Sequence, residues 1–398
     1  MAMKAKGKTV FVGMSGGVDS SVAAALLKSP PAGGGYNVVG VHLKCFNVDG
    51  CAAEDAEDAR RAAEHLNIPF YAFDYEQEYK DLVVKYMVDG YKKGITPNPD
   101  VMCNKEIKFG LFYKKALEMG ADYVATGHYV RRVISHSSLV IRNAKTQLPI
   151  TNYQLLVARD AQKDQSYFLW TLKPEQLKHC LFPVGDYKKP QVRKLAEKFG
   201  LHNAAKKDSQ GICFLGQVSL PDFLAKYVKP KKGPIVIAPA LRSFSEGGSE
   251  TKKSYRIIGT HNGAHFYTIG QRHLGIKNQE LGIKNKPNQK PFYVAAKNVK
   301  DNTITVVEGD DHPALYQTEI NLSQVNFLNK ELRIKNNEKI PVMARVRYRQ
   351  PLVPALFIIH NSQFMIQFKK PVKFVAPGQS AVFYDKKGVM LGGGIIIR

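Results

Sequence analysis

An apolar run near the start of the chain is followed by three very small residues and then by a helical pattern, in the segment TVFVGMSGGVDSS from Thr9 to Ser21. Thr9 to Val12 is typical of a strand that is covered on both faces, and Ser20 to Leu27 is predicted to be helical. Between them, Ser15 to Gly17 allows backbone N–H groups and the positive end of the helix dipole to approach an anion closely. The segment therefore predicts a phosphate-binding loop, for which an ordinary strand-to-helix turn is the alternative.

Two details narrow the chemistry of this loop. It lacks the Lys of the G-x-x-x-x-G-K-[ST] motif, which normally reaches a terminal phosphate, so a kinase-like loop is disfavoured. Asp19 stands at the start of the predicted helix, where a carboxylate can hold Mg²⁺ and can also stabilise the helix dipole. The order SGG-V-DS directly after a strand resembles the pyrophosphate-loop ATPases, which release pyrophosphate from ATP and leave AMP attached to a substrate.

A second candidate for chemistry is a cysteine that follows two prolines, in the segment TPNPDVMCNKEIKF from Thr96 to Phe109. The prolines predict a stiff, non-helical approach to a helix from Lys105 to Met119. Cys103 would then lie near a helix N-terminus with Lys105 and Lys108 close in sequence, and both effects favour the thiolate. We expect a partly exposed, reactive thiol here, for which a buried structural cysteine is the alternative.

A third candidate is the segment KKDSQGICFLG, from Lys206 to Gly216. Its glycines allow movement, so Cys213 could swing between partners, whereas a turn with an inert cysteine is the alternative.

Gly127 and His128 follow a predicted strand at Ala121 to Thr126, and ligands of parallel sheets bind at the carboxyl ends of strands. On its own, His128 would more often be a capping or core residue.

The elements that must position these residues alternate between strands and helices. Strands are expected at Tyr36 to Leu43 and Pro69 to Phe73, and helices at Ala52 to Leu66 and Glu76 to Lys92. This βαβ rhythm predicts a doubly wound parallel sheet with helices on both faces. The expected fold class is therefore α/β in the N-terminal part of the chain.

From Val218 onward, short β-rich pieces replace the helical pattern. They are Ile235 to Ile237, Tyr255 to Ile258, Phe292 to Ala295 and Thr303 to Val307. From about His312 the chain reads as evenly spaced short strands, which predicts a small C-terminal β-barrel. We expect three domains: residues 1–210 (catalytic), 211–308 (central and β-rich) and 309–398 (barrel).

The predicted barrel carries an alternating run of arginines. Arg345, Arg347 and Arg349 would project from one face of a strand at Val342 to Tyr348. Such a face suits contact with phosphates and bases, with Tyr348 nearby. A solvated sheet face is the alternative.

Length and composition indicate the number of domains, the class of partner and the compartment. The chain has 398 residues, which predicts two or three domains. Lys and Arg number 58 against 34 acidic residues, a net charge of +24 that favours nucleic acid as partner, although a basic proteome or a mitochondrial-type environment is the alternative. No apolar run approaches the roughly 20 residues that span a bilayer, and no signal or transit peptide is recognisable. We expect no membrane contact, and bacterial cytoplasm rather than a mitochondrial matrix.

The cysteines argue for a reducing compartment. There are five of them, an odd count without a C-x-x-C pair, which disfavours a disulfide scaffold or a zinc ribbon. His42, Cys45 and Cys51 have metal-binding side chains, but the pattern offers no fourth ligand. No metal site of protein ligands is predicted.

Eight ordered segments together resemble the tRNA-specific 2-thiouridylase family: GMSGGVDSS, TPNPDVMCNKEIKF, ATGHY, KDQSYFL, KKDSQGICF, YTIGQR, RVRYRQ and PGQSAVFY. The resemblance spans nearly the whole chain and implies an ATP-dependent sulfurtransferase that replaces the C2 oxygen of the wobble uridine of certain tRNAs by sulfur. The family often has Met where Leu43 stands, and Thr or Met where Gln210 stands. The implied fold is an adenine nucleotide hydrolase-like domain with a pyrophosphate loop, followed by the two β-rich parts.

The resemblance also implies roles for individual residues. The ATP site would comprise Gly13, Met14, Ser15, Gly16, Gly17, Val18, Asp19, Ser20, Leu43 and Gly127. The target base would meet Asn98, Pro99 and Asp100. Catalysis would rest on Cys103 as the nucleophile, Cys213 as the persulfide carrier, and Asp100. The positions that contact tRNA would be His128, Lys163, Asp164, Gln165, Arg347, Tyr348 and Gln379.

The implied partners are ATP with Mg²⁺, tRNA, and a persulfide sulfur donor such as a cysteine desulfurase or a sulfur-relay protein. Adenylation would turn the C2 oxygen into a good leaving group, and a second thiol would release sulfur from the persulfide by forming a disulfide with its carrier. Another pyrophosphate-loop ligase, such as a tRNA lysidine synthetase or an amidating synthetase, is an alternative that needs neither cysteine. A non-catalytic RNA-binding protein with a degenerate nucleotide site is a second alternative.

Overall fold

The computed structural model describes residues 7–29, 35–48, 52–140, 147–208, 211–216, 218–238, 256–272, 274, 290–328 and 336–397, with the side chains of residues 136–140, 147–151 and 213 left aside. The elements of the N-terminal domain are β1 (Thr9–Gly13), α1 (Val18–Lys28), β2 (Asn37–Lys44), α2 (Ala52–His65), β3 (Phe70–Asp74), α3 (Glu76–Tyr79), η1 (Lys80–Val84), α4 (Lys85–Lys92), α5 (Pro99–Met102), η2 (Cys103–Phe112), α6 (Tyr113–Glu118), β4 (Tyr123–Thr126), β5 (Arg131–Val140), β6 (Gln147–Leu156), η3 (Ser166–Leu169), α7 (Pro174–Leu177), β7 (Cys180–Leu181) and α8 (Lys189–Lys198).

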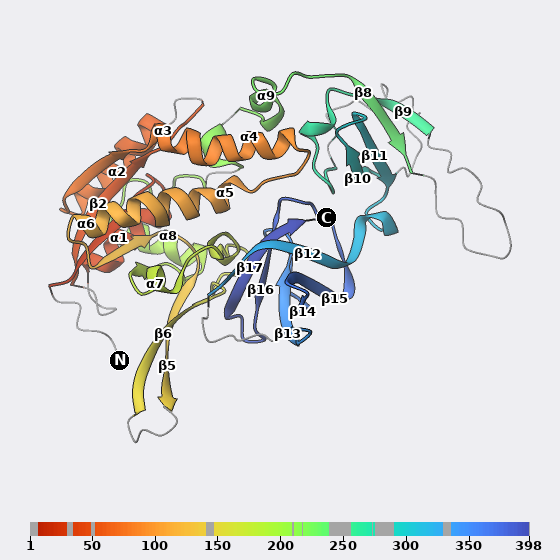
Figure 1. Cartoon of the computed structure of the whole chain (residues 1–398). Helices are drawn as coiled ribbons and strands as arrows, with labels where there is room; N and C mark the ends of the chain where they lie inside the picture. Colours follow the sequence, from red (N-terminus) through yellow and green to blue (C-terminus); the bar gives the residue numbers. More distant parts are fainter. Residues whose placement is uncertain are drawn as a thin grey trace.

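Two β-rich parts follow the N-terminal domain. After α8 come η4 (Cys213–Leu215) and then the elements of the central domain, which are α9 (Leu220–Ala225), β8 (Gly233–Ile237), β9 (Arg256–His261), η5 (Ala264–Phe266), β10 (Phe292–Asn298) and β11 (Thr303–Glu308). The C-terminal part contains η6 (Pro313–Leu315), β12 (Tyr316–Phe327), β13 (Lys339–Arg345), β14 (Val353–His360), β15 (Gln363–Lys373), β16 (Ser380–Tyr384) and β17 (Met390–Ile397). Figure 1 shows these parts side by side.

Five parallel strands form the sheet of the N-terminal domain, in the order β3-β2-β1-β4-β7. The central strand is buried on both faces, because Val10 and Val12 belong to one core and Phe11 to the other. Helices α1, α2 and α8 cover the first face, and η2 and α6 cover the second. The predicted doubly wound parallel sheet is confirmed.

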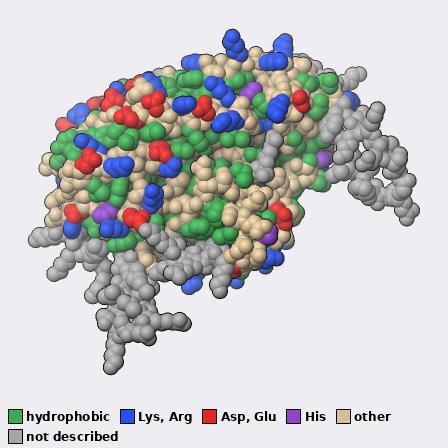
Figure 2. Space-filling model, in the orientation of Figure 1, with side chains coloured by type: hydrophobic (Ala, Val, Ile, Leu, Met, Phe, Trp, Pro, Cys, Tyr) green, Lys and Arg blue, Asp and Glu red, His purple; other side chains and the backbone are tan. Residues whose placement is uncertain are grey.

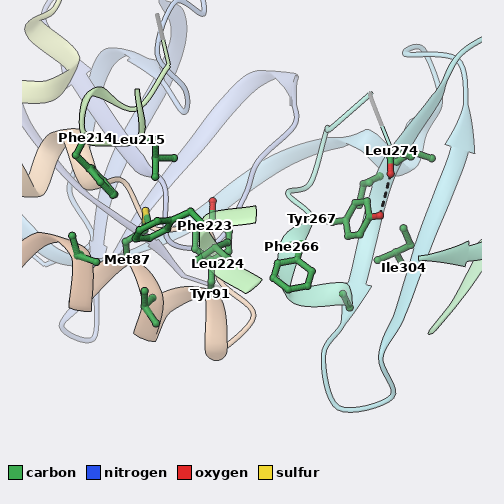
Figure 3. Packing of buried hydrophobic residues seen from close by; sticks show 14 of the residues in the cluster. Met87, Tyr91, Phe214, Leu215, Phe223, Leu224, Phe266, Tyr267, Leu274 and Ile304 are labelled. Atoms are coloured by element: carbon green, nitrogen blue, oxygen red, sulfur yellow. Dashed lines mark hydrogen bonds between the residues drawn. The ribbon is translucent and has the colours of Figure 1, made fainter. Parts of the chain in front are cut away.

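The central domain is built on a four-stranded sheet in the order β10-β11-β8-β9, in which β8 and β11 run parallel. This sheet packs against α4 and α9 through one hydrophobic cluster that includes Tyr91, Phe223 and Phe266 (Figure 3). Cys103 and Phe214 belong to the same cluster. The central domain therefore packs directly on the helices that carry Cys103.

The C-terminal part is a closed six-stranded barrel, β12-β15-β14-β13-β16-β17, around a core that includes Phe357 and Phe383. This confirms the predicted barrel. The arginine prediction is wrong, because β13 ends at Arg345 and Arg349 adopts a positive φ of 65° beyond it. Arg345 is buried in an ion pair with Asp164, so the three arginines do not form one exposed strand face.

A polar and aromatic seam joins the barrel to the N-terminal domain. Tyr167 Oη donates to the backbone oxygen of Ser380 at 2.8 Å, and Trp170 Nε1 donates to the Ser380 hydroxyl at 2.9 Å. A Cβ on Gly393 of β17 would lie 2.6 Å from the Trp170 ring. The barrel therefore packs against the apolar run that follows Gln165.

Our predictions missed the hairpin of β5 and β6. The two strands pair from Arg131 opposite Leu156 to Val140 opposite Gln147. Figure 1 shows the hairpin projecting away from the domain body. Among the described residues, no helix is long and apolar enough to cross a membrane.

Basic side chains are unevenly distributed over the visible surface. In Figure 2 they gather over the edge formed by α4, α9 and β8, whereas acidic side chains gather over α2 and α3. The exposed lysines of this basic edge are Lys92, Lys93, Lys226, Lys229, Lys231 and Lys232. Lys231 lies next to η5, since its backbone nitrogen donates to Asn262 O at 2.9 Å.

Candidate active site

The loop between β1 and α1 has the geometry of an anion cradle. Gly17 is the N-cap of α1, and no side chain caps that end of the helix, so the first-turn N–H groups and the helix dipole are left for a ligand. Ser20 Oγ, which accepts a bond from Ser15 N at 3.1 Å, closes the loop from within. The loop lies at the carboxyl end of the central strand, where such sheets bind ligands.

Two glycines of the cradle permit close backbone contacts. Gly16 has a φ of +74°, and a Cβ there would lie 2.2 Å from the backbone oxygen of Asp55. A Cβ on Gly127 would lie 2.6 Å from the backbone nitrogen of Ser20. Any larger residue at either position must displace backbone, so these glycines shape the cradle.

The structure brings the predicted nucleotide-binding residues together. Gly13 is in register with Val41 of β2 and Thr126 of β4, so the ends of the three strands lie side by side. Leu43, near the end of β2, packs against two hydrophobic clusters, the one that contains Cys103 and the one on the η2 face of the sheet. Met14, between strand and loop, is buried and donates its backbone N–H to Val41 O at 2.7 Å.

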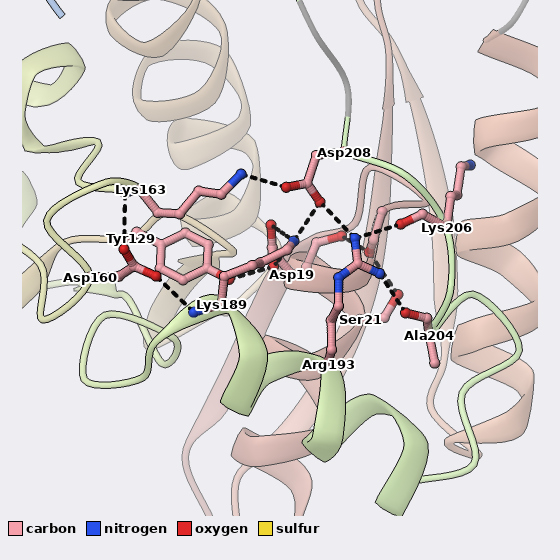
Figure 4. A network of polar contacts seen from close by, with 12 residues as sticks. Asp19, Ser21, Tyr129, Asp160, Lys163, Lys189, Arg193, Ala204, Lys206 and Asp208 are labelled. Atoms are coloured by element: carbon pink, nitrogen blue, oxygen red, sulfur yellow. Dashed lines mark hydrogen bonds and ion pairs between the residues drawn. The ribbon is translucent and has the colours of Figure 1, made fainter. Parts of the chain in front are cut away.

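Asp19, the candidate Mg²⁺ ligand, already has partners (Figure 4). Its carboxylate lies 2.8 and 2.9 Å from Lys189 Nζ and accepts a hydrogen bond of 2.7 Å from Tyr129 Oη. Among the described residues, no group of three or more His, Cys, Asp or Glu side chains is arranged to hold a metal ion. A metal ion at the cradle would therefore need phosphate oxygens as further ligands.

The helix that carries Cys103 begins earlier than predicted. Asn98 Oδ1 caps it by accepting the backbone N–H of Val101 at 3.2 Å, and Pro99 occupies its first position. Proline is tolerated there because that N–H would have no helical partner. The helix expected from Lys105 therefore starts at Pro99, and Cys103 lies inside it.

Cys103 is a free thiol but is only 5% exposed. Burial raises its pKa above the ordinary value, and the nearby Lys108 only partly opposes this effect. The predicted partly exposed thiolate is thus wrong for this structure, because desolvation outweighs the helix terminus and the lysines. Lys108 follows Cys103 by five residues in the π-helical element η2, whose hydrogen bonds join residues five apart, and it is close enough to affect the thiol.

Two further titratable groups interact with Lys108, as Cys103 does, and we call the surroundings of Asp100, Cys103, Lys108 and His128 the Cys103 pocket. Burial raises the pKa of the Asp100 carboxyl, and Lys108 opposes the shift. Burial and then Lys108 lower the pKa of His128 well below its ordinary range, and His128 Nδ1 is hydrogen-bonded to Thr126 Oγ1 at 2.8 Å. The resting pocket therefore favours an uncharged thiol and an uncharged imidazole around one cationic side chain.

The two cysteine segments converge although they are far apart in sequence. Cys213 begins η4, and the next residue, Phe214, is buried in the cluster that contains Cys103. The Phe214 ring lies 5.6 Å from the ring of Tyr79, which hydrogen-bonds to Cys103. The Tyr79 side chain therefore contacts both Cys103 and the η4 residue Phe214. The Cys213 sulfur itself is outside the described side chains.

The remaining cysteines are in other environments. Cys180 is a fully buried free thiol whose pKa burial raises to about 12, which is typical of an inert core cysteine. Cys45 is partly buried. Cys51 and Gln210 lie outside the described residues.

Known relatives match the whole of this architecture. Residues 8–217 match a family model described as a tRNA methyl transferase HUP domain, residues 221–308 match its PRC-barrel domain, and residues 317–396 match an aminomethyltransferase beta-barrel domain. The tRNA-specific 2-thiouridylase MnmA 1 of Geobacillus kaustophilus is 43% identical over 397 residues, which cover 98% of this chain and 96% of that protein. That of Christiangramia forsetii is 40% identical over 417 residues, with 98% and 100% covered.

The chain belongs to the tRNA-specific 2-thiouridylase family. This confirms the resemblance stated from the eight sequence segments. The cradle and the Cys103 pocket both lie within residues matched by the HUP-domain model.

The residues that the family resemblance assigned to tRNA contact have internal partners in this structure. Lys163 Nζ is paired with Asp208 at 2.5 Å, and Gln165 Oε1 accepts the backbone N–H of Tyr129 at 2.9 Å. Asp164 is 5% exposed and bonds to Arg345 and to Ser166. The Asp164 side chain is therefore a buried structural group here, not one presented to a ligand.

The barrel residues of that set also have partners within the protein. Gln379 Nε2 donates to the backbone oxygens of Thr96 at 2.9 Å and Pro97 at 3.3 Å, directly before the Cys103 helix. Tyr348 packs with its ring 4.5 Å from that of Phe168. The Arg347 guanidinium lies 5.9 Å from the Phe374 ring.

Sequence reasoning missed several residues of the site. Tyr79 and Lys189 contribute to it from positions outside the eight segments. For Tyr129 a signal existed, since it directly follows His128 in the segment ATGHY. Lys189 stands at the start of an amphipathic basic helix, and only the packing of α8 against α1 shows that it reaches the cradle.

Proposed function

We propose that this protein adenylates the C2 oxygen of the wobble uridine of tRNA and replaces it with sulfur from a persulfide, which gives 2-thiouridine, AMP and pyrophosphate. The observation that carries the proposal is the convergence of Cys103 and the Cys213 segment in one cluster. The family membership agrees with this chemistry.

The cradle and the cysteine pocket are contiguous, which supports a two-step reaction on one base. Gly127 touches the start of α1, and the neighbouring His128 ring lies 6.1 Å from that of Phe109 on the cysteine-bearing helix. At the end of β1, a Cβ on Gly13 would lie 3.5 Å from the ring of Phe112, which belongs to the same helix as Cys103. A base held between Asn98 and His128 would therefore reach both nucleotide and thiol.

The first step needs a good leaving group on C2. In the proposed step, the C2 oxygen attacks the α-phosphate of ATP and pyrophosphate departs, so the oxygen leaves later within AMP. The cradle N–H groups would stabilise the developing phosphate charge, because they are fixed before the reaction. Asp19 fits as the one protein ligand of Mg²⁺, which supplies charge neutralisation at the phosphates when it is bound.

The second step delivers sulfur. In the proposed step, Cys103 attacks the inner sulfur of a Cys213 persulfide, and hydrosulfide is released beside the adenylated base. The released sulfur gains two electrons and the two cysteines lose two as they form a disulfide. The hydrosulfide then attacks C2, and AMP leaves with the original oxygen.

The buried Asp100 carboxyl fits proton exchange in this pocket. Its raised pKa brings proton uptake closer to neutral pH, where general acid–base catalysis is most effective. We propose that Asp100 accepts the proton of the Cys103 thiol as that thiol attacks. Asn98 and Pro99 would then hold the extruded base, since a stacked base cannot reach the pocket.

We further propose that tRNA docks across the barrel side of the pocket and along the basic edge. His128, Lys163, Gln165, Arg347 and Tyr348 are the candidate contacts on the pocket side, and Asp164 and Gln379 act by positioning their neighbours. Domain boundaries near residues 210 and 308 would place the docking surface across all three domains. The sulfur donor would be a persulfide-carrying protein, such as a cysteine desulfurase or a sulfur-relay protein.

Mass spectrometry of nucleosides tests the proposal. Unmodified tRNA incubated with the protein, ATP and a persulfide source should yield 2-thiouridine together with AMP and pyrophosphate. Cys103→Ala and Cys213→Ala should each abolish the product and leave tRNA binding largely intact, with the buried Cys180→Ser as control. Pyrophosphate release without 2-thiouridine would instead indicate another ligase, and wild-type product in either cysteine variant would rule out the sulfur relay.

A further inference from the structure

Asp208 lies at the centre of a cluster of cations that faces the cradle (Figure 4). Its carboxylate is 2.5 Å from Lys163 Nζ, 2.7 Å from Lys189 Nζ and 3.3 Å from Arg193 Nη2. Partial burial raises the pKa of Asp208, but the bonds from Lys163 and Lys189 outweigh it, so the pKa falls below its ordinary value. One carboxylate thus occupies a site that three cationic side chains surround.

Lys189 connects this cluster to the phosphate cradle. Its Nζ bonds to Asp208 at 2.7 Å and also to both oxygens of Asp19, in the first turn of α1. The Lys189 side chain is only 10% exposed, and its backbone N–H donates to Asp160 at 2.9 Å. A cation from α8 therefore stands beside a cradle that has no lysine of its own.

The cluster has the chemistry of a polyphosphate site. Lys163, Lys189 and Arg193 carry three positive charges against the two carboxylates that they contact, Asp19 and Asp208. Lysine and arginine bind phosphate oxygens with the same charge-assisted bonds that they form with carboxylates. The β- and γ-phosphates of an ATP seated in the cradle would compete with the Asp208 carboxylate for these cations.

The competing carboxylate belongs to the segment that leads to Cys213. Arg193 holds that segment through the backbone oxygens of Ala204 at 2.9 Å and Lys206 at 3.1 Å. Lys206 is in turn paired with Asp55 and Asp58 of α2. The segment is therefore fastened to α8 by Asp208 and to α2 by Lys206, five to seven residues before Cys213.

We propose that Lys189 and Arg193 bind the β- and γ-phosphates of ATP, that Asp208 occupies their place until ATP displaces it, and that this displacement frees the segment that carries Cys213. The inference rests on the proposed function, since it concerns the ATP that the thiolation reaction consumes. It couples the two steps of that reaction: the sulfur carrier is released only when the nucleotide site is filled. Lys206 stays bound to α2 and serves as the hinge.

Calorimetric titration of the full-length protein with ATP and with AMP tests the binding part. Lys189→Met should weaken ATP binding about tenfold or more, as expected for a lost charge-assisted bond, and leave AMP binding within about twofold, because AMP has no β- or γ-phosphate. Arg193→Met should act in the same direction, and Lys189→Arg should restore ATP affinity. Lys188→Met is the matched control, because Lys188 is exposed and adjacent in sequence.

Asp208→Asn separates this inference from a merely structural ion pair. Removing the competing charge should strengthen ATP binding several-fold, whereas a structural role would weaken it or leave it unchanged. Hydrogen exchange of residues 204–216 should rise when ATP is added to the wild type, and should be high without ATP in Asp208→Asn. Unchanged AMP binding shows that the variants are folded.

Two results would overturn the inference. One is equal ATP affinity in the wild type, Lys189→Met and Arg193→Met. The other is protection, rather than exposure, of residues 204–216 by ATP. Neither readout involves sulfur transfer, so a protein that discriminates ATP from AMP as described but makes no 2-thiouridine would contradict the proposed function alone.

Discussion

At the scale of single residues, burial governs the state of the Cys103 thiol. The side chain lies in an apolar cluster, and burial raises its pKa while Lys108 opposes the shift. The residue types alone pointed to a thiolate, because sequence neighbours show nearby charge but not the packing that removes water. The glycines of the cradle were predictable, since the need for a close backbone approach follows from the loop itself.

The pH dependence of Cys103 alkylation follows from this environment. Because burial raises the pKa of the Cys103 thiol above its ordinary value, the thiolate is scarce at pH 7, and alkylation by iodoacetamide should keep accelerating as the pH rises past the pKa of an ordinary thiol. Lys108→Met should slow the reaction at pH values below the thiol pKa, since loss of the opposing cation raises that pKa further. Peptide mapping by mass spectrometry assigns the modified cysteine.

Lys105→Met is the matched control for that experiment. Lys105 is exposed and paired with Glu106 at 2.8 Å, so its loss should leave the alkylation rate of Cys103 within about twofold. An alkylation midpoint below pH 8 in the resting protein would contradict the burial argument. Equal effects of the two lysine substitutions would show that Lys108 has no special position.

At the scale of elements, the positions of helices and strands follow from local sequence patterns, whereas the elements against which they pack do not. The strands β1 to β4, the helices of the N-terminal domain and the barrel strands were largely predictable from apolar periodicity and turn residues. The start of α5 was missed because Pro99 was read as a helix breaker, although proline also fits the first turn. The buried bond between Arg345 and Asp164 joins residues of two domains, which no local pattern reveals.

This buried pair predicts a double-mutant result. Arg345 also donates to Ser166 Oγ at 2.9 Å and to Tyr384 Oη at 2.7 Å. Arg345→Met leaves the Asp164 charge buried without its partner, which should cost about 3–5 kcal/mol of unfolding free energy. Adding Asp164→Asn removes that charge and should recover a large part of the loss.

The fluorescence of Trp170 measures this effect. Trp170 is the only tryptophan of the chain, and it is buried where the barrel meets the N-terminal domain. Urea titration should show the barrel seam opening at lower urea in Arg345→Met than in the double variant. The reverse order would mean that the Asp164 charge is not the cause of the destabilisation.

Gln379 offers a second prediction at this scale. Its amide fixes the backbone of Thr96 and Pro97, before the Cys103 helix. Gln379→Ala should therefore lower the single-turnover thiolation rate about tenfold to a hundredfold through misplaced catalytic groups, with ATP affinity unchanged. The exposed Lys386→Ala on the same barrel is the control.

The two roles of Gln379 give different results. A positioning residue changes the rate of thiolation and leaves tRNA affinity within about twofold. If Gln379 contacts tRNA instead, the affinity should fall while the rate at saturating tRNA is retained. Filter binding alongside the rate measurement separates these outcomes.

At the scale of the whole molecule, the net charge of +24 is distributed unevenly over the surface. Exposed lysines collect along the edge of α4, α9 and β8, and acidic residues collect over α2 and α3 (Figure 2). The sequence predicted the excess of charge, but the location of the edge depends on how the central domain packs on α4. A polyanion should therefore dock on one side of the molecule.

Salt dependence tests this docking surface. The logarithm of tRNA affinity should fall steeply and linearly with the logarithm of salt concentration, because bound phosphates release counterions. The triple variant Lys229→Ala/Lys231→Ala/Lys232→Ala should reduce the slope by about 2. Lys114→Ala/Lys115→Ala, two exposed lysines of α6, is the control, and an unchanged slope in the triple variant would reject the basic edge.

The central claim is that Cys103 and Cys213 act together on one base. Its most direct measurement is non-reducing peptide mapping after a single turnover, with persulfide-loaded protein, ATP and tRNA in the absence of reductant. We predict one Cys103–Cys213 disulfide for each 2-thiouridine formed, and none when ATP is omitted. Formation of 2-thiouridine with both cysteines still unlinked would contradict it.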